Sequence, residues 1–351
     1  MPRTASSSPH LVAGARCVIL LVGLAAALVF SIAFAIGIGT VDVPVGRVAE
    51  IVLAHLFSGT AGLDPLTDQI VWDFRTPRVL LAALAGAGLS LAGVCLQTLV
   101  RNPLADPYLF GVSAGASLGA VVALTTGGIV MASLGVAGAA FAGSLISLAI
   151  VFVMAQRGGR LLGSGLVLAG VAVAALGNAA TSYVQLQAGP AEVRRVMFWL
   201  LGSVSGAKWA DLGVPAVAVG LTAVWLIAQG RSMNALSVGD DTAAGLGVNV
   251  HLLRIQLLVA SSLLTATVVS VAGGIGFVGL IVPHAVRLVV GPDHRKLLPV
   301  SLLTGAVFLV LVDLVTRTVD RPNEMPIGIF TAALGAPFFL VLLRNRKKVW
   351  R

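Results

Sequence analysis

Long apolar runs, separated by short polar connections, account for most of the chain. Each run is close to the roughly 20 residues that an α-helix needs to cross the hydrocarbon core of a bilayer. Most of the charged residues fall in the connections. The pattern predicts about ten membrane-spanning helices. They are placed at residues 17–39, 78–99, 109–126, 130–155, 162–186, 211–229, 252–272, 276–290, 299–317 and 327–343.

A shorter apolar segment, residues 192–204, follows the fifth run. It is too short to span a bilayer, and two arginines stand near its start. Trp199 is typical of a side chain at the membrane–water interface. We predict a short interfacial helix here, on the outer side. The longest outer connection, at about residues 40–77, has prolines and several acids, and no element is predicted within it.

Composition supports the bilayer as the solvent of this chain. Of its 351 residues, 58% are hydrophobic and only 11% are charged, and the mean hydropathy is +1.00. A soluble protein of this size could not bury so much apolar surface. The 41 glycines are also in keeping with membrane helices, which associate by close packing of small residues. The fold class predicted is an all-α integral membrane protein, with residues 1–351 forming one transmembrane domain.

The distribution of basic residues predicts the orientation. An even number of crossings puts both termini on the same side. If that side is the cytoplasm, most of the 23 lysine and arginine residues fall in inner connections, as the positive-inside rule requires. Residues 1–16 are then a cytoplasmic tail, and the longest inner connection is the loop at about residues 230–254.

The motifs of several enzyme and metal-binding classes are missing. The chain has no G-x-x-x-x-G-K-[ST] sequence to cradle ATP phosphates and no H-E-x-x-H or C-x-x-C metal pattern. We therefore predict no catalytic residue, no metal site and no cofactor in this chain. Asp313 is the one carboxylate placed inside a predicted span, and it stands four residues before Arg317, so the two can pair on one helix face.

The inner loop 230–254 contains the signals of a short helix. Asp240 and Asp241 favour a helix N-terminus electrostatically, and Gly245 or Gly247 can end the helix. The pattern by itself is also compatible with an ordinary connector. We predict a short helix at the membrane surface between two spans.

Three further segments place proline beside ionisable residues. Arg75–Arg78 reads R-T-P-R at the outer start of the second span, where proline suits the first helical turn. Arg101–Pro107 reads R-N-P-L-A-D-P, and its two prolines break the helix at the inner side. Phe277–Arg287 reads F-V-G-L-I-V-P-H-A-V-R inside an apolar span, where ionisable groups are costly. We expect His284 to be a packed side chain rather than a metal ligand.

The fifth span is unusually polar near its outer end. Its polar side chains are Asn178, Thr181, Ser182, Tyr183, Gln185 and Gln187. They cannot all face lipid, because lipid offers no hydrogen-bond partners. They are expected to line a water-filled path or a helix interface.

These segments together resemble the FecCD-type permeases, the membrane subunits of ATP-driven importers for iron chelates, haem and vitamin B12. The resemblance extends over about residues 20–344 and implies the fold of a type II ABC importer permease. The stretch V-G-D-D-T-A-A-G-L-G-V looks like the family's coupling loop, which docks on an ATPase.

The resemblance assigns expected roles to particular residues. The residues expected to contact the ATPase are Val238, Gly239, Asp240, Asp241, Ala243, Ala244, Leu246 and Gly247. Those expected to bind a substrate-binding protein are Arg75, Arg78 and Arg317. The cytoplasmic gate comprises Asn102, Leu104, Gly163 and Ser164. The translocation path is bordered by Asn178, Ser182 and Gln185.

The resemblance also implies function and partners. The chain would pair with a second copy or a related permease in the bacterial inner membrane. Two cytoplasmic ATPases, which bind the ATP and magnesium, and an extracytoplasmic binding protein would complete the importer. The cargo expected is a ferric siderophore first, haem second and cobalamin third. Two other classes stay open as alternatives: an ion-coupled secondary transporter, disfavoured by the scarcity of intramembrane acids, and a membrane-embedded enzyme, which lacks a candidate nucleophile.

Overall fold

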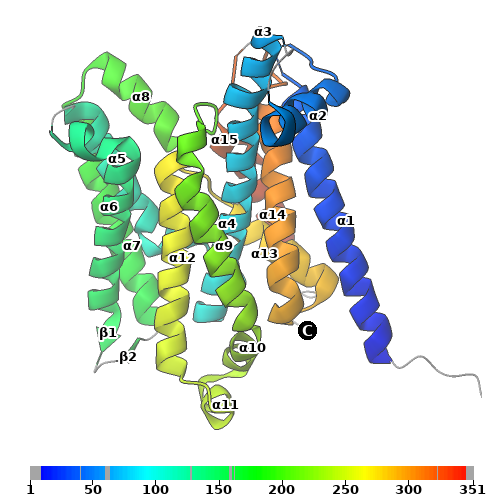
Figure 1. Cartoon of the computed structure of the whole chain (residues 1–351). Helices are drawn as coiled ribbons and strands as arrows, with labels where there is room; N and C mark the ends of the chain where they lie inside the picture. The colour runs from blue at the N-terminus through cyan, green and yellow to red at the C-terminus, as the bar shows by residue number, and fades with distance from the viewer. Residues whose placement is uncertain are drawn as a thin grey trace, which may run out of the picture.

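The protein is an almost entirely helical bundle (Figure 1). The computed structural model describes residues 9–39, 41–59, 64–126, 129–157, 160–161, 163–321 and 323–344. The α-helices are α1 (Pro9–Gly37), α2 (Val45–Leu53), α3 (Pro65–Asp68), α4 (Thr76–Val100), α5 (Val112–Thr126), α6 (Ile129–Ala155), α7 (Gly163–Leu186), α8 (Pro190–Leu200), α9 (Gly213–Ala228), α10 (Gly230–Val238), α11 (Asp240–Gly245), α12 (Val250–Ala272), α13 (Val278–Val290), α14 (His294–Thr316) and α15 (Ile327–Arg344). Short π-helical and 3-10 turns are η1 (Ala54–Ser58), η2 (Gln69–Arg75), η3 (Pro107–Phe110) and η4 (Trp209–Asp211). The two-residue strands β1 (Gln156–Arg157) and β2 (Arg160–Leu161) pair antiparallel.

Each of the predicted spans corresponds to one of these helices, and the predicted all-α membrane fold is confirmed. Within the described residues, 7 helical stretches are long and apolar enough to cross a membrane. The spans predicted at 109–126, 276–290 and 327–343 match the shorter apolar helices α5, α13 and α15. The 13 residues of α13 extend about 20 Å, less than the roughly 30 Å of a hydrocarbon core.

The short helices are preceded by irregular backbone. Gly111, before α5, and Phe277, before α13, both have left-handed backbone angles, with φ of 72° and 68°. Such backbone is tolerated at membrane depth only where protein covers it and pairs its polar groups. The segment 273–277 lies in such a place, because neighbouring connections hydrogen-bond to one another around it. The amide of Ser203 donates to the carbonyl of Ala272 at 2.8 Å.

Figure 1 shows short helices gathered at the two ends of the bundle. The end with α2, α3 and α8 is called the outer end here, and the end with α10, α11 and the β1–β2 pair is the inner end. The short helix predicted at 192–204 is confirmed as α8, at Pro190–Leu200. The connection 40–77, for which no element was predicted, contains α2, η1, α3 and η2.

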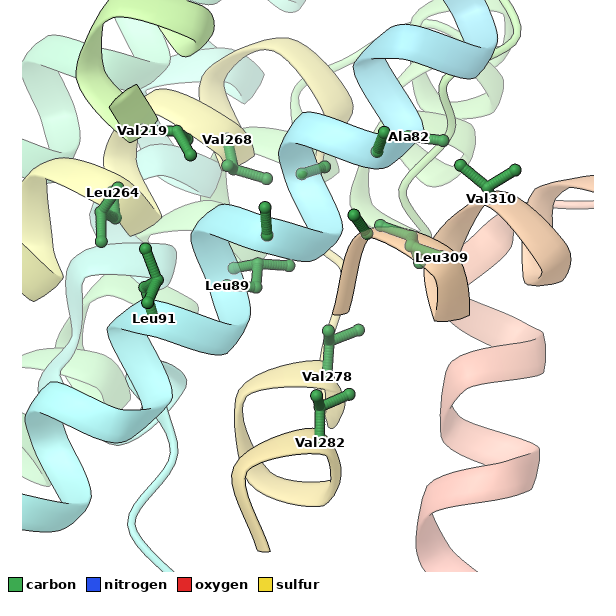
Figure 2. Close-up of a cluster of buried hydrophobic side chains, with 14 of the residues drawn as sticks. Ala82, Leu89, Leu91, Val219, Leu264, Val268, Val278, Val282, Leu309 and Val310 are labelled. Carbon is green, nitrogen blue, oxygen red and sulfur yellow. The ribbon is translucent and has the colours of Figure 1, made fainter. Parts of the chain in front are cut away.

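Helix α4 is the central helix of the bundle. Nearly all of its side chains are buried, and it contacts α9, α12, α13 and α14. Figure 2 shows Leu89 and Leu91 of α4 among apolar side chains of these neighbours. By contrast α1 lies at the edge of the bundle with most of its surface exposed, as expected for a helix in contact with lipid.

Close helix contacts depend on glycine at two positions of α4. A Cβ added at Gly86 would collide with the carbonyl oxygen of Gly305 in α14, and one at Gly93 would collide with that of Gly279 in α13. The backbones therefore touch at these crossings. Small residues permit such approach, and the resulting van der Waals contact is a main source of stability between membrane helices.

We expect the substitution Gly305→Ala to destabilise the α4–α14 contact. Its new Cβ would overlap the carbonyl oxygen of Gly86 and the side chain of Ser90, so the helices must separate. The cost should be about 1–3 kcal/mol, as for other overpacked sites. It is measured as a lower thermal midpoint of the detergent-solubilised protein. Gly220→Ala in α9 is the matched control, because a Cβ there meets open space. Equal midpoints for the two variants would contradict the packing described.

Candidate functional site

A buried carboxylate lies between two arginines at the outer end. Asp313 of α14 has no exposed surface. Its Oδ1 accepts a hydrogen bond from Nε of Arg78 at 2.9 Å, and its Oδ2 lies 2.9 Å from Nη2 of Arg317. Arg78 also donates through Nη1 to Glu324 at 2.7 Å. These four residues form the outer charge cluster. The predicted pairing of Asp313 with Arg317 is confirmed.

Arg75 has a different set of partners. Its Nη1 donates to the carbonyls of Ile36 and Gly37 at 2.9 and 3.0 Å, and its Nη2 donates to the carbonyl of Val41. Ile36 and Gly37 are the last residues of α1, whose terminal carbonyls have no partner within the helix. Arg75 therefore caps α1 and joins it to the start of α4.

All three arginines predicted to receive a binding protein are thus buried and already paired within the chain. Within the outer charge cluster, the side chain of Glu324 is the most exposed, at 44%. The more exposed bases of the outer end include Arg47, Arg195 and Arg321. The sequence analysis did not single these out, because nothing in the local pattern distinguishes an exposed arginine from a buried one.

The predicted coupling loop forms two short helices at the inner end, and the predicted helix start and stop are confirmed. Helix α11 begins at Asp240, and Gly247 beyond its end has a φ of 83°. Val238 and Leu246 are 73% and 70% exposed, which is unusual for large apolar side chains. Ala243 is fully buried and holds α11 against the bundle, so it does not belong to the exposed face.

The partly exposed side chain of Asp240 is hydrogen-bonded to two arginines of the same chain. Its Oδ1 accepts hydrogen bonds from Nη2 of Arg101 at 2.8 Å and from Nη2 of Arg254 at 3.0 Å. Arg101 ends α4 and Arg254 lies in the first turns of α12. Asp241, next in sequence, is exposed. The two acids that the sequence presents as equivalent therefore have different surroundings.

The predicted gate residues fall into two groups. Leu104 lines a cavity of about 360 Å³ together with Asp106, Tyr108, Phe277, Leu280 and Phe339, whereas Asn102 is exposed and its side chain accepts from the amide of Leu104. Gly163 and Ser164 begin α7, but their side chains lie outside the described residues.

An acid that the prediction passed over lies in the same cavity as Leu104. Asp106 is in the connection between α4 and α5, outside both helices. Burial raises the pKa of its carboxyl to about 6, against the opposing effect of the Tyr108 amide, which donates to it at 2.8 Å. The sequence R-N-P-L-A-D-P could have indicated this acid, because Asp106 stands only two residues after the predicted gate residue Leu104.

The predicted path residues of α7 lie on a surface that other helices of the chain leave open. Asn178 and Ser182 are exposed, and Gln185 is half-buried. Polar side chains open to the outside of a membrane bundle need water or a partner protein. Their placement suits either alternative named from the sequence, a path or a helix interface.

The Pro-His segment lies in α13. His284 is buried and its ring meets that of Phe338 edge-on. Arg287 donates through Nη2 to Oε1 of Gln97 at 3.0 Å and so joins α13 to α4. Within the described residues, no group of three or more His, Cys, Asp or Glu side chains could hold a metal ion.

Comparison with known proteins identifies the family. The profile of the FecCD transport family matches residues 27–345. The chain belongs to the FecCD transport family. The matched range includes the outer charge cluster, the cavity around Leu104 and the inner loop with α10 and α11.

Relatives of this FecCD protein are named for several cargoes. The cobalamin import system permease protein BtuC of Halobacterium salinarum is 49% identical over 82% of this chain and 76% of its own length. A probable iron chelatin transport system permease protein of Helicobacter pylori is 41% identical, covering 80% and 84%. The hemin transport system permease protein HmuU of Yersinia pestis is 39% identical, covering 80% and 86%.

A solved structure has the same fold as this FecCD protein. It is described as an inward-facing conformation of a metal-chelate type ABC transporter. The two superpose with a TM-score of 0.80 at 33% sequence identity, covering 93% of this chain and 98% of the other. The predicted permease fold is thereby confirmed.

In this FecCD protein we expect Asp313→Asn to be strongly destabilising. It would leave Arg78 and Arg317 buried without their shared negative charge, and breaking a buried pair costs about 3–5 kcal/mol. Glu324→Gln is the matched comparison. It removes an acid at the exposed edge of the same cluster, where ion pairs contribute about 0–1 kcal/mol. Thermal midpoints in detergent measure both, and a loss for Glu324→Gln as large as that for Asp313→Asn would contradict this account.

Proposed function

We propose that this chain is the membrane-spanning permease of an ATP-driven, binding-protein-dependent importer in the bacterial inner membrane. The observation that carries the proposal is the short helix α11 at the inner end, with Val238 and Leu246 exposed beside it. Two large apolar side chains exposed on a connection between spans are available for contact with another protein. Membership of the FecCD family over residues 27–345 supports that contact being an ATPase.

The proposed transport cycle uses this chain as a moving barrier rather than as a catalyst. Two ATPase subunits bind ATP and magnesium and dock on the α10–α11 loops of two permeases. Closure of the ATPases displaces α11 as a rigid element, and such shifts at an interface can switch a membrane protein between two packed states. The path between the permeases then opens to one side at a time. The second permease is either another copy or a paralogue.

The cargo proposed is a bulky metal chelate. The relatives are named for cobalamin, haemin and iron chelate, and they do not favour the ferric siderophore that the sequence analysis put first. The described residues contain no cluster of metal ligands that would select one cargo by coordination. We therefore propose that the cargo is selected by the binding protein and by the size of the path.

An ion-coupled secondary transporter is the second candidate. Such carriers usually place free acids at membrane depth. Here Asp313, the acid predicted inside a span, is neutralised by two arginines. This pairing favours a structural role for Asp313.

We expect Leu246→Asp to weaken copurification of the ATPase encoded beside this permease by roughly tenfold or more, because a charge placed at the centre of an apolar contact removes its main binding energy. Val319→Asp provides the control. It changes an exposed apolar residue to the same acid at the other end of the molecule. Equal ATPase recovery in the Leu246→Asp and wild-type proteins would rule out this docking surface.

The proposed function is tested with the whole importer in liposomes. Permease, ATPase and binding protein are reconstituted together, and uptake of cyanocobalamin, haemin and ferrichrome is followed side by side. We expect vanadate-sensitive, ATP-dependent uptake of one of these cargoes. Uptake that follows an imposed ion gradient and ignores ATP would replace the proposal with a secondary transporter.

A further inference from the structure

Asp240 connects three segments of the inner end. It is the first residue of α11, and its Oδ1 accepts from Arg101 at the end of α4 and from Arg254 near the start of α12. In sequence, Arg101 is 139 residues from Asp240. A carboxylate shared by two guanidinium groups is a directional contact, because charged hydrogen bonds fix distance and angle together.

Arg101 stands where the chain turns from helix α4 into the loop with Asn102 and Leu104. It has left-handed backbone angles, φ 52° and ψ 38°, which are unfavourable for a residue with a side chain. Such conformations persist only where the surroundings hold them. The contact with Asp240 is one such restraint, so the turn at Arg101 and the position of α11 are linked.

The loop that begins at Arg101 is short, and it is hydrogen-bonded both to the last turn of α4 and within itself. The amide of Asn102 donates to the carbonyl of Gln97 at 3.1 Å, and the side chain of Asn102 accepts from the amide of Leu104 at 2.9 Å. A movement of Arg101 is therefore carried to Leu104 over few rotatable bonds. Leu104 lines the cavity of about 360 Å³ opposite Phe277 and Phe339.

We propose that Arg101 is a positioning residue that transmits displacement of α11, through Asp240, to the loop of Asn102 and Leu104. The inference rests on the proposed function, since it takes α11 to be the element that the ATPase moves. The two side chains are 39% and 41% exposed, so the pair contributes little to folding stability, and exposed ion pairs are commonly worth 0–1 kcal/mol. In this proposal, the pair instead fixes the position of α11 relative to the loop that follows α4 during transport.

Arg254 is the second arginine that binds Asp240, and it lies in the helical bundle. Its side chain is 10% exposed and belongs to α12, which packs along α4. Arg254 and Arg101 both donate to Oδ1 of Asp240, Arg254 from within α12 and Arg101 from the start of the loop. Because Asp240 belongs to α11, a displacement of α11 changes its distance to both guanidinium groups, and of the two only Arg101 is continuous with the loop.

The test compares uptake with ATP hydrolysis in reconstituted importers that contain Arg101→Gln. Uptake of the cargo found for the wild type is divided by the ATP hydrolysed in the same vesicles. We expect this ratio to fall roughly five- to tenfold, the lower range of coupling between linked sites. ATPase copurification and the thermal midpoint should stay at wild-type values, because the exposed face of Val238 and Leu246 is untouched. Arg101→Lys keeps the positive charge and should restore most of the ratio.

Two comparisons separate coupling from other causes. Arg344→Gln removes an exposed positive charge from α15 at the same end and should leave the ratio unchanged. The double variant Arg101→Gln with Asp240→Asn should be no worse than the more impaired single variant, because residues acting through one contact are not additive. An unchanged ratio in Arg101→Gln would overturn the inference alone, as would parallel loss of copurification or stability. Lack of ATP-dependent uptake in the wild type would instead overturn the proposed function.

Discussion

The burial of α4 on all sides is the constraint from which the rest of the architecture follows. A helix surrounded by other helices in a membrane gains little from the hydrophobic effect, since lipid is as apolar as its neighbours. Its stability comes from close contact, and glycine at positions 86 and 93 lets the α14 and α13 backbones approach. The other helices are arranged around these crossings, and α1 and α7 are left with large exposed faces.

Because α4 runs through the bundle, it also connects the two ends of the molecule. Its outer end begins at the arginines that cap α1 and bind Asp313. Its inner end finishes at Arg101, in contact with Asp240 of α11. The regular helix stops there at a left-handed turn, since Arg101 has a φ of 52°.

The sequence predicted best what the bilayer itself imposes. The apolar runs predicted each long helix. Asp240 and Asp241 at the start, with Gly245 or Gly247 at the end, predicted the short helix α11, because helix start and stop signals are local. Short helices α2 and α3 were missed, since an interfacial connection needs no continuous apolar run. Contacts between distant residues could not be read from the pattern. Arg78 and Asp313 are 235 residues apart, and nothing near either one shows that they pair and lose their exposure.

The hydrogen bonds that surround the segment before α13 have a mechanical consequence. The amides of Ile327 and Gly328 donate to the carbonyls of Gly202 and Leu201, and Ser203 donates to the end of α12. Three connections distant in sequence are thus fastened to one another by their main chains, independently of side-chain identity. The start of α15 cannot tilt without carrying the α12 terminus with it. A substitution of side chains in these connections therefore leaves the hydrogen bonds that hold the ends of α12 and α15 together in place.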